Sequence, residues 1–246
     1  MPGFPYRLED GAENKLGLIV LQVDEPIEGD FRRIIPPDAA QLHVSRVPSG
    51  DALTPETVSV METKLAASAA LLPPASRFDV VGYACTSGTA LIGAERVRTL
   101  VKQGVATRQV TDPLSAAVAA TEALGVKKLG IVSPYIATVA NSLSDAFRDA
   151  GITVAETLSF GEDVEARVAR ISPASISEAA VALARRGGLD GIFISCTNLR
   201  TLSVIEPLEK EIGLPVLSSN QVLAWHMARI SPAPITLSGP GLLFEI

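Results

Sequence analysis

Two segments of this chain repeat each other, and each ends in one of its only two cysteines. Residues 79–86 read DVVGYACT and residues 190–197 read DGIFISCT. In both, an aspartate precedes an apolar run that ends in cysteine and threonine. An apolar run of this length is typical of a buried strand. The repeat therefore predicts two related halves, each placing one thiol, Cys85 or Cys196, at the end of a strand.

A second pair of similar segments supports two halves. Leu16-Gly17 and Leu129-Gly130 both open short aliphatic runs at corresponding places in the two halves. We expect an N-terminal half over residues 1–107 and a C-terminal half over 108–230. The segment 231–246, rich in proline and glycine, is expected to pack back on the N-terminal half.

Short apolar runs alternate with longer amphipathic stretches along the whole chain. This alternation is typical of a parallel sheet with right-handed helical crossovers. The expected fold is therefore α/β, with two Rossmann-like (flavodoxin-like) half-domains related by a pseudo-two-fold axis. The expected strands are 16–21, 41–47, 80–83, 128–132, 153–159, 191–194 and 215–217. The expected helices are 54–72, 90–101, 113–124, 137–150, 176–186, 202–212 and 221–230.

Composition and charge exclude several classes of function. The net charge of −6 disfavours a nucleic-acid surface, which needs a basic face. No apolar run is long enough to span a membrane, and the N-terminus has no secretory signal. We therefore expect a cytoplasmic protein with reduced thiols. Two cysteines and two scattered histidines do not have zinc-site spacing, so no metal is expected, and no glycine fingerprint indicates a dinucleotide cofactor.

Both cysteines precede a predicted helix. The start of a helix presents free N–H groups and a partial positive charge, which favours a thiolate and is expected to lower the pKa of each thiol. The same N–H groups, with the polar side chains of Thr86, Ser87, Thr197 and Asn198, form a site for a carboxylate. Two thiols facing each other across a small pocket would move protons on both sides of one carbon.

The motifs around the thiols resemble a known superfamily. Residues 17–20 (GLIV), 84–88 (ACTSG), 133–135 (SPY) and 195–198 (SCTN) are similar to the aspartate/glutamate racemases. Within that superfamily, the chain most resembles the branch of maleate cis-trans isomerases, arylmalonate decarboxylases and ectoine-utilisation proteins. The resemblance implies catalysis without a cofactor, at a site between two Rossmann-like halves.

The resemblance also implies roles for individual residues. Cys85 and Cys196 correspond to the two reactive cysteines, and Tyr135 to a tyrosine of the site. Thr86, Ser87, Thr197 and Asn198 correspond to the side chains that hold the substrate carboxylate. The expected partner is a small carboxylate substrate, and a homo-oligomer is expected.

One segment departs from the maleate isomerases, which carry a Pro-Ser-Ser-Asn stretch after the first strand. Here residues 21–24 read LQVD, a form closer to the ectoine-utilisation group. A carboxylate cannot donate a hydrogen bond to a substrate carboxylate unless it is protonated. Asp24 therefore favours a substrate with a cationic nitrogen, such as an amino acid; the alternative is a solvated acidic loop.

Three functions stay open at this stage. The first is racemisation or isomerisation, with the two thiols exchanging a proton at an α-carbon. The second is cis-trans isomerisation of an unsaturated diacid, in which Cys85 adds covalently to the alkene. The third is a small-molecule sensor on the same fold. The decarboxylases of the family lack the first thiol, so Cys85 disfavours that reaction.

Overall fold

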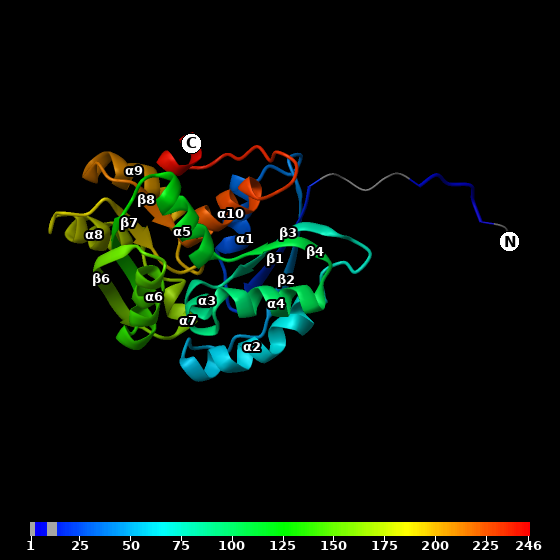
Figure 1. Cartoon of the computed structure of the whole chain (residues 1–246), viewed down its shortest axis with the longest axis horizontal. Helices are drawn as coiled ribbons and strands as arrows, with labels where there is room; N and C mark the ends of the chain where they lie inside the picture. Colours follow the sequence, from blue (N-terminus) through cyan, green and yellow to red (C-terminus); the bar gives the residue numbers. More distant parts are fainter. Residues whose placement is uncertain (1–2, 9–13) are drawn as a thin grey trace.

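Two four-stranded parallel sheets form the frame of the molecule (Figure 1). The computed structural model describes residues 3–8 and 14–246. The first sheet has the strand order β2-β1-β3-β4 and the second β6-β5-β7-β8. Both follow the flavodoxin-like order, in which the first strand of each half lies inside the sheet. The predicted α/β class with two related halves is therefore confirmed.

The first sheet and its helices come from the N-terminal part of the chain. Its strands are β1 (Lys15–Leu21), β2 (Gln41–Val47), β3 (Phe78–Ala84) and β4 (Thr107–Thr111). The helices between them are α1 (Ile27–Ile34), α2 (Pro55–Ala69), α3 (Thr86–Ile92) and α4 (Ala94–Gly104). Thr54 caps α2 in a reciprocal capping box with Thr57, which satisfies two otherwise free backbone donors.

The second sheet repeats this arrangement. Its strands are β5 (Lys128–Tyr135), β6 (Thr153–Glu162), β7 (Gly191–Ile194) and β8 (Val216–Ser218). Its helices are α6 (Ala137–Asp149), α7 (Glu165–Val168), α8 (Pro173–Ala184) and α9 (Leu202–Ile212). The sequence of β7 is apolar throughout because both faces of this strand are buried. Phe193 packs in one core cluster, and Ile192 and Ile194 pack in the other.

Two further helices each follow one sheet in the chain but pack against the other sheet. Helix α5 (Pro113–Ala123) follows the first sheet, yet Leu114 and Ala117 pack in one core with Ile131 and Phe193 of the second sheet. Helix α10 (Ser219–Arg229) follows the second sheet but packs on β3 and α1 of the first. The two helices also pack against each other (Figure 1). Each sheet is therefore covered in part by the last helix of the other half.

Several elements differ from those predicted. Residues 107–111, expected at the boundary between halves, form the edge strand β4, whose first three residues are partly or fully exposed and give no apolar run. The helix expected over 90–101 is divided at Gly93, whose φ of 92° ends α3 and starts α4. Helix α1 was not predicted. The exact boundary between halves stays a prediction, because α5 and α10 lie across it.

The C-terminal segment 231–246 contacts both halves. The Ser238 amide donates to the Ile34 carbonyl at 2.8 Å, which fixes the segment against α1 of the first half. Further along, the Gln221 side chain donates to the Pro240 carbonyl, and the Leu242 amide donates to Glu209 of α9. The last residues form a short 3-10 helix, Leu242–Glu245. The segment thus covers the region where α10 joins the two halves.

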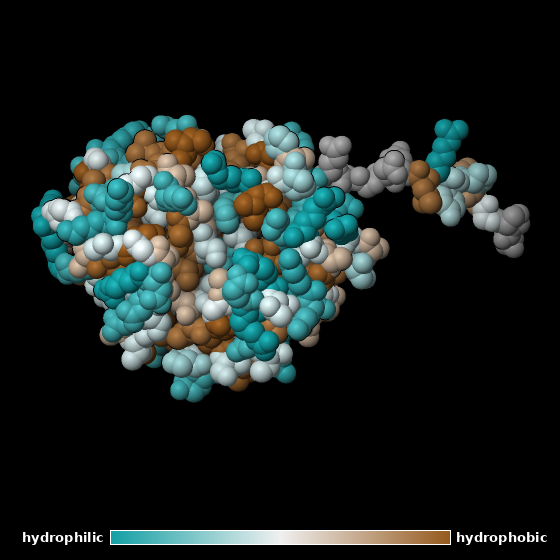
Figure 2. All heavy atoms as spheres, in the orientation of Figure 1, coloured by the Kyte–Doolittle hydropathy of each residue, from teal (hydrophilic) through white to brown (hydrophobic). Residues whose placement is uncertain are grey.

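The side of the molecule seen in Figures 1 and 2 carries both hydrophilic and hydrophobic residues at its surface. Figure 2 shows hydrophilic residues over much of it, with neutral and hydrophobic residues interspersed, more often toward the middle of the view. Among the described residues, no helix is both long and apolar enough to cross a membrane.

A pair of glycines in helices tests the packing of α2 against α4. A Cβ at Gly104 would lie 2.1 Å from the Ala66 carbonyl oxygen and 2.7 Å from the Ala69 Cβ, so Gly104→Ala must push the helices apart. We expect it to lower the free energy of unfolding by about 1–3 kcal/mol. Gly29→Ala in α1 is the matched control, because an added Cβ there meets nothing within 4 Å. Urea unfolding that shows equal stability for both variants would contradict the close packing.

Candidate active site

The candidate site lies where the central strands of both sheets end. In open parallel sheets, ligands bind at the carboxyl ends of strands where the strand order reverses. In the first half that point is between β1 and β3, which Asp24 and Cys85 follow. In the second half it is between β5 and β7, where Tyr135 ends β5 and Cys196 follows β7. All four side chains are buried, with Cys85 and Cys196 only 3% and 4% exposed.

Cys85 caps helix α3, which begins at Thr86, four residues before the predicted start at residue 90. Its sulfur accepts a hydrogen bond from the Gly88 amide at 3.2 Å, and its carbonyl accepts from the Thr89 hydroxyl at 2.8 Å. The close approach needs glycine, because a Cβ at Gly88 would lie 2.7 Å from the sulfur and 2.8 Å from the Tyr83 hydroxyl. Cys85 therefore sits at the first turn of α3 with a backbone donor aimed at its sulfur.

Cys196 lies in the turn before α9, which begins six residues later at Leu202, as predicted. Its φ of 108° is in the region that favours glycine, a strained backbone of the kind that occurs at functional sites. Its sulfur accepts from the Asn198 amide at 3.3 Å and lies 3.0 Å from the Tyr135 hydroxyl. The predicted helix 202–212 is confirmed, but the turn 197–201 lies between its free N–H groups and the Cys196 sulfur.

Buried hydrogen bonds connect the two Cys-Thr motifs directly. The hydroxyl of Ser219, at the start of α10, accepts from the Cys196 amide at 3.0 Å and lies 2.8 Å from the Thr86 hydroxyl. The Thr197 hydroxyl donates to the Ala84 carbonyl, one residue before Cys85, at 3.3 Å. The two motifs that repeat in the sequence are therefore neighbours in the fold, and Ser219, which joins them, was not among the predicted site residues.

Glu165 is the most important residue of the site that sequence reasoning missed. It lies at the start of α7 and is 1% exposed, although glutamate is almost never fully buried without a partner. Its amide donates to the Asp51 carbonyl at 2.9 Å, next to an antiparallel bridge between Ala52 and Val164. Contacts with the first half thus fix this side chain of the second half. Its segment has no apolar periodicity and lies far in sequence from both cysteines, so no signal pointed to it.

Both oxygens of Glu165 are occupied. The Tyr135 hydroxyl donates to Oε1 at 2.8 Å, and the Asn198 amide group donates to Oε2 at 2.8 Å. The Tyr135 hydroxyl also lies 3.0 Å from the Cys196 sulfur. Asn198 in turn accepts from the Glu25 amide at 3.0 Å. Tyr135 and Asn198, both predicted to contact substrate, are therefore part of one buried network with Cys196.

Asp24 is buried rather than part of a solvated loop. It is 3% exposed, and its Oδ1 accepts from the Ile27 amide at 3.1 Å. Its Oδ2 has no hydrogen-bond partner within the part of the chain that the structure describes. Burial raises the pKa of Asp24 to about 7. A buried carboxylate oxygen without a protein donor is a position for a ligand donor.

The electrostatics of the thiols differ from the sequence-based expectation. Burial raises the pKa of Cys85 to about 12 and raises that of Cys196 well above its usual range; the carboxyl groups of Glu165 and Asp24 add to both shifts. The expected lowering of the thiol pKa is therefore not found. The helix start at Cys85 works in the expected direction, since the Gly88 amide lowers its pKa, but desolvation is the larger effect.

Two other residues lie within this region, the predicted Ser87 and Asn220, which was not among the predicted site residues. Ser87 is buried in the first turn of α3, beside Thr86. Asn220 donates to the Thr197 carbonyl at 2.9 Å and to Asp30 at 2.8 Å, so it holds the turn after Cys196 against α1. Within the described ranges, no group of three or more histidine, cysteine, aspartate or glutamate side chains is arranged to hold a metal ion.

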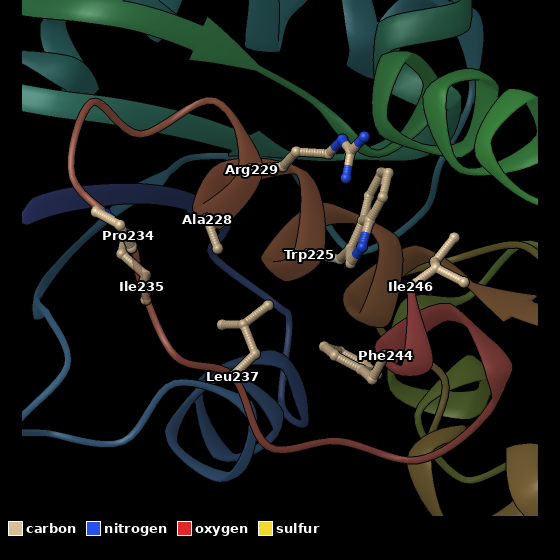
Figure 3. A pocket seen from close by; sticks show the side chains of 8 residues that line it. All are labelled: Trp225, Ala228, Arg229, Pro234, Ile235, Leu237, Phe244 and Ile246. Carbon is tan, nitrogen blue, oxygen red and sulfur yellow. The ribbon is translucent and has the colours of Figure 1, made fainter.

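A surface cavity of about 300 Å³ lies elsewhere, between α10 and the C-terminal segment (Figure 3). Trp225 and Phe244 line it, and the Arg229 guanidinium lies 5.2 Å from the centre of the Trp225 ring. Neither cysteine contributes to it. The site around the thiols is closed in this structure, because the side chains that form it are all buried: Asp24, Cys85, Thr86, Tyr135, Glu165, Cys196 and Asn198.

Residues 51–244 match the arylmalonate decarboxylase family, so the chain belongs to that family. The match covers both cysteines, Tyr135 and Glu165. It confirms the predicted branch, which groups maleate isomerases and arylmalonate decarboxylases within the aspartate/glutamate racemase superfamily.

Individual relatives agree with this assignment. A maleate isomerase of Geobacillus stearothermophilus is 25% identical over 219 residues, which are 83% of this chain and 86% of that protein. An arylmalonate decarboxylase of Bordetella bronchiseptica is 29% identical over 110 residues, 44% of this chain and 46% of that protein.

Solved structures share the fold. The crystal structure of maleate isomerase Iso from Pseudomonas putida S16 has a TM-score of 0.84 at 24% identity, over 94% of this chain and 98% of that one. A cysteine-to-serine mutant of Nocardia farcinica maleate cis-trans isomerase, with a covalently bound succinylcysteine intermediate, has a TM-score of 0.81 at 23% identity, over 94% of this chain and 98% of that one. These relatives support the prediction that the chain is an enzyme of the isomerase class. In the present chain, Cys85 and Cys196 are both free thiols.

The raised pKa of Asp24 makes stability depend on pH. An unfolded aspartate ionises near pH 4, whereas buried Asp24 holds its proton to about pH 7. The unfolded state therefore releases a proton first, and the free energy of unfolding falls as pH rises from about 4 to 7. Asp24→Asn removes this loss. The free energy of unfolding of the variant should therefore be higher than that of the original protein by up to about 4 kcal/mol at pH 7–8, and the two should be equal near pH 4. Denaturant unfolding at both pH values checks the difference.

Proposed function

We propose that the protein is a cofactor-independent racemase or isomerase that moves a proton at the α-carbon of a small amino acid. Cys85 and Cys196 carry the reaction. One thiolate removes the α-proton and the other thiol returns a proton to the opposite side of the carbon. The hydroxyls of Thr86 and Ser87 hold the substrate carboxylate where negative charge develops, while Thr197 and Asn198, which donate to Ala84 and Glu165, position the turn after Cys196.

The observation that carries this proposal is the convergence of the thiols from different halves on one buried cluster. Cys196 lies 3.0 Å from the Tyr135 hydroxyl, and the charges of both cysteines raise the pKa of that hydroxyl, although burial is the largest cause. The Thr86–Ser219–Cys196 hydrogen bonds hold the motifs together. Two acid–base groups at one buried site are what a two-base proton transfer requires.

Asp24 and Glu165 indicate the class of substrate. Both carboxyl groups are buried at the site, and Oδ2 of Asp24 has no donor within the described residues. An ionised Asp24 would repel a second carboxylate on the substrate, whereas an ammonium group would supply the missing donors and lower the desolvation cost. The similarity to ectoine-utilisation proteins makes diamino acids of ectoine breakdown the first substrates to examine.

Proton exchange with solvent tests the reaction. Incubated in heavy water with the protein, the correct amino acid should lose its α-proton signal in NMR as its optical rotation falls to zero. Cys85→Ser and Cys196→Ser should each reduce racemisation by at least about 100-fold, because each removes one of the two acid–base groups. Full racemase activity in either variant would contradict the two-thiol mechanism.

A second function, cis-trans isomerisation of an unsaturated diacid, is favoured by the maleate isomerase relatives. In that reaction Cys85 adds to the alkene, the central bond rotates, and Cys196 handles the proton. Intact-protein mass spectrometry of Cys196→Ser with maleate distinguishes the two functions. Racemisation predicts no adduct, whereas a mass increase of one diacid on Cys85 would establish the isomerase.

Asp24 provides a matched test of substrate class. Asp24→Asn replaces the carboxylate with an amide that donates a hydrogen bond. If Asp24 holds the substrate ammonium group, kcat/KM for the amino acid should fall by at least about tenfold. Glu206→Gln, an exposed residue of α9 paired with Lys210, is the control and should leave kcat/KM unchanged. An equal effect of both variants would remove Asp24 from substrate recognition.

A further inference from the structure

The carboxyl group of Glu165 is directed at the protein rather than at a ligand. Its Oε1 accepts from the Tyr135 hydroxyl at 2.8 Å and its Oε2 accepts from Asn198 at 2.8 Å. Asp24, by contrast, keeps one oxygen without a donor in the described part of the chain. The two acidic residues therefore have different roles, and only Asp24 has a free position for substrate.

Tyr135 connects Glu165 to Cys196. Its hydroxyl donates to Glu165, so at the 3.0 Å contact with the Cys196 sulfur the thiol is the donor and the tyrosine oxygen the acceptor. The direction of both hydrogen bonds is then from sulfur to tyrosine to carboxylate. This is the arrangement in which a proton leaves the thiol and another arrives at the carboxylate without any side chain moving.

We propose that Glu165 is the proton acceptor for Cys196, with Tyr135 as the relay between them. The S–H proton moves to the tyrosine oxygen while the tyrosine O–H proton moves to Oε1 of Glu165. The S–H bond and one O–H bond break, two O–H bonds form, and the negative charge passes from the carboxylate to the sulfur. The tyrosine is neutral before and after.

Burial explains why such a transfer is needed. Ionising the thiol while Glu165 stays charged would place two negative charges in one desolvated cluster, which is strongly unfavourable. The relay keeps the charge of the pair constant. Burial raises the pKa of both Glu165 and Cys196, so each group favours its neutral form and one proton fewer between them leaves a single negative charge to share. The charge of Asp24 also raises the pKa of Cys196, and the charge of Cys85 raises the pKa of Tyr135. The titrations of these groups are therefore coupled.

Cys85 has a different environment. Its sulfur accepts from the Gly88 amide at the start of α3, and the nearby Tyr83 hydroxyl donates to the Met61 sulfur rather than to a carboxylate. No carboxyl group is hydrogen-bonded to Tyr83 within the described residues. The two thiols are therefore inequivalent, with Cys196 equipped to act as the base. This role in turnover rests on the proposed function, but the relay itself does not require a substrate.

Alkylation by iodoacetamide tests the relay without substrate. In the Cys85→Ser background, the rate at Cys196 should be constant above the apparent pKa of the Glu165–Cys196 pair and fall below it. Adding Glu165→Gln or Tyr135→Phe should slow Cys196 at pH 7 by at least about tenfold, and the rate should then rise about tenfold per pH unit. In the Cys196→Ser background, Glu165→Gln should not slow Cys85, an equally buried thiol, because the Glu165 charge raises the pKa of Cys85 and its removal can only speed the reaction.

The sign of the effect makes the test decisive. If Glu165 acts only as a neighbouring charge, its removal lowers the pKa of Cys196 and alkylation becomes faster. Faster or unchanged alkylation of Cys196 in Glu165→Gln would overturn the proposal. Equal slowing of Cys85 and Cys196 would also overturn it, because it would show a general structural effect; thermal unfolding of each variant verifies the fold. A relay confirmed in a protein that racemises no amino acid would refute the proposed function alone.

Discussion

One buried set of hydrogen bonds holds the two halves of the site together. The Ser219 hydroxyl joins the Cys196 amide to the Thr86 hydroxyl, and the Thr197 hydroxyl reaches the Ala84 carbonyl. Buried polar groups of this kind are costly to leave without partners, so they specify one arrangement of the halves. The position of each thiol relative to the other follows from this network rather than from direct contact between sulfurs.

The backbone of the molecule is nearly symmetric, but the charges at its centre are not. Both sheets share one strand order, and both thiols follow the third strand of their half. Yet Cys85 faces a helix start, whereas Cys196 lies in a strained turn beside Tyr135 and Glu165. A duplicated frame thus supplies two equivalent positions, and the side chains around them give each position its own acid–base character.

The sequence predicted the frame and the thiols because both leave local signals. The apolar runs ending in Cys85 and Cys196 marked two central strands, and β2 and β7 were predicted with the residues that the structure shows. The edge strand β4 was missed because its exposed side chains have no apolar pattern. Glu165 was missed for another reason: its role comes from tertiary contacts with Tyr135 and the first half, which no local periodicity encodes.

The exchange of α5 and α10 between the halves limits how a substrate can reach the buried thiols. A hinge that swung the sheets apart would pull each of these helices from the core it completes, exposing residues such as Phe193 and Met227 to water. The segments 22–26 and 162–171, which carry Asp24 and Glu165 of the site, meet instead in the exposed Glu25–Arg170 ion pair, and an exposed pair contributes little to stability. A substrate must therefore reach the thiols while α5 and α10 keep the two sheets joined.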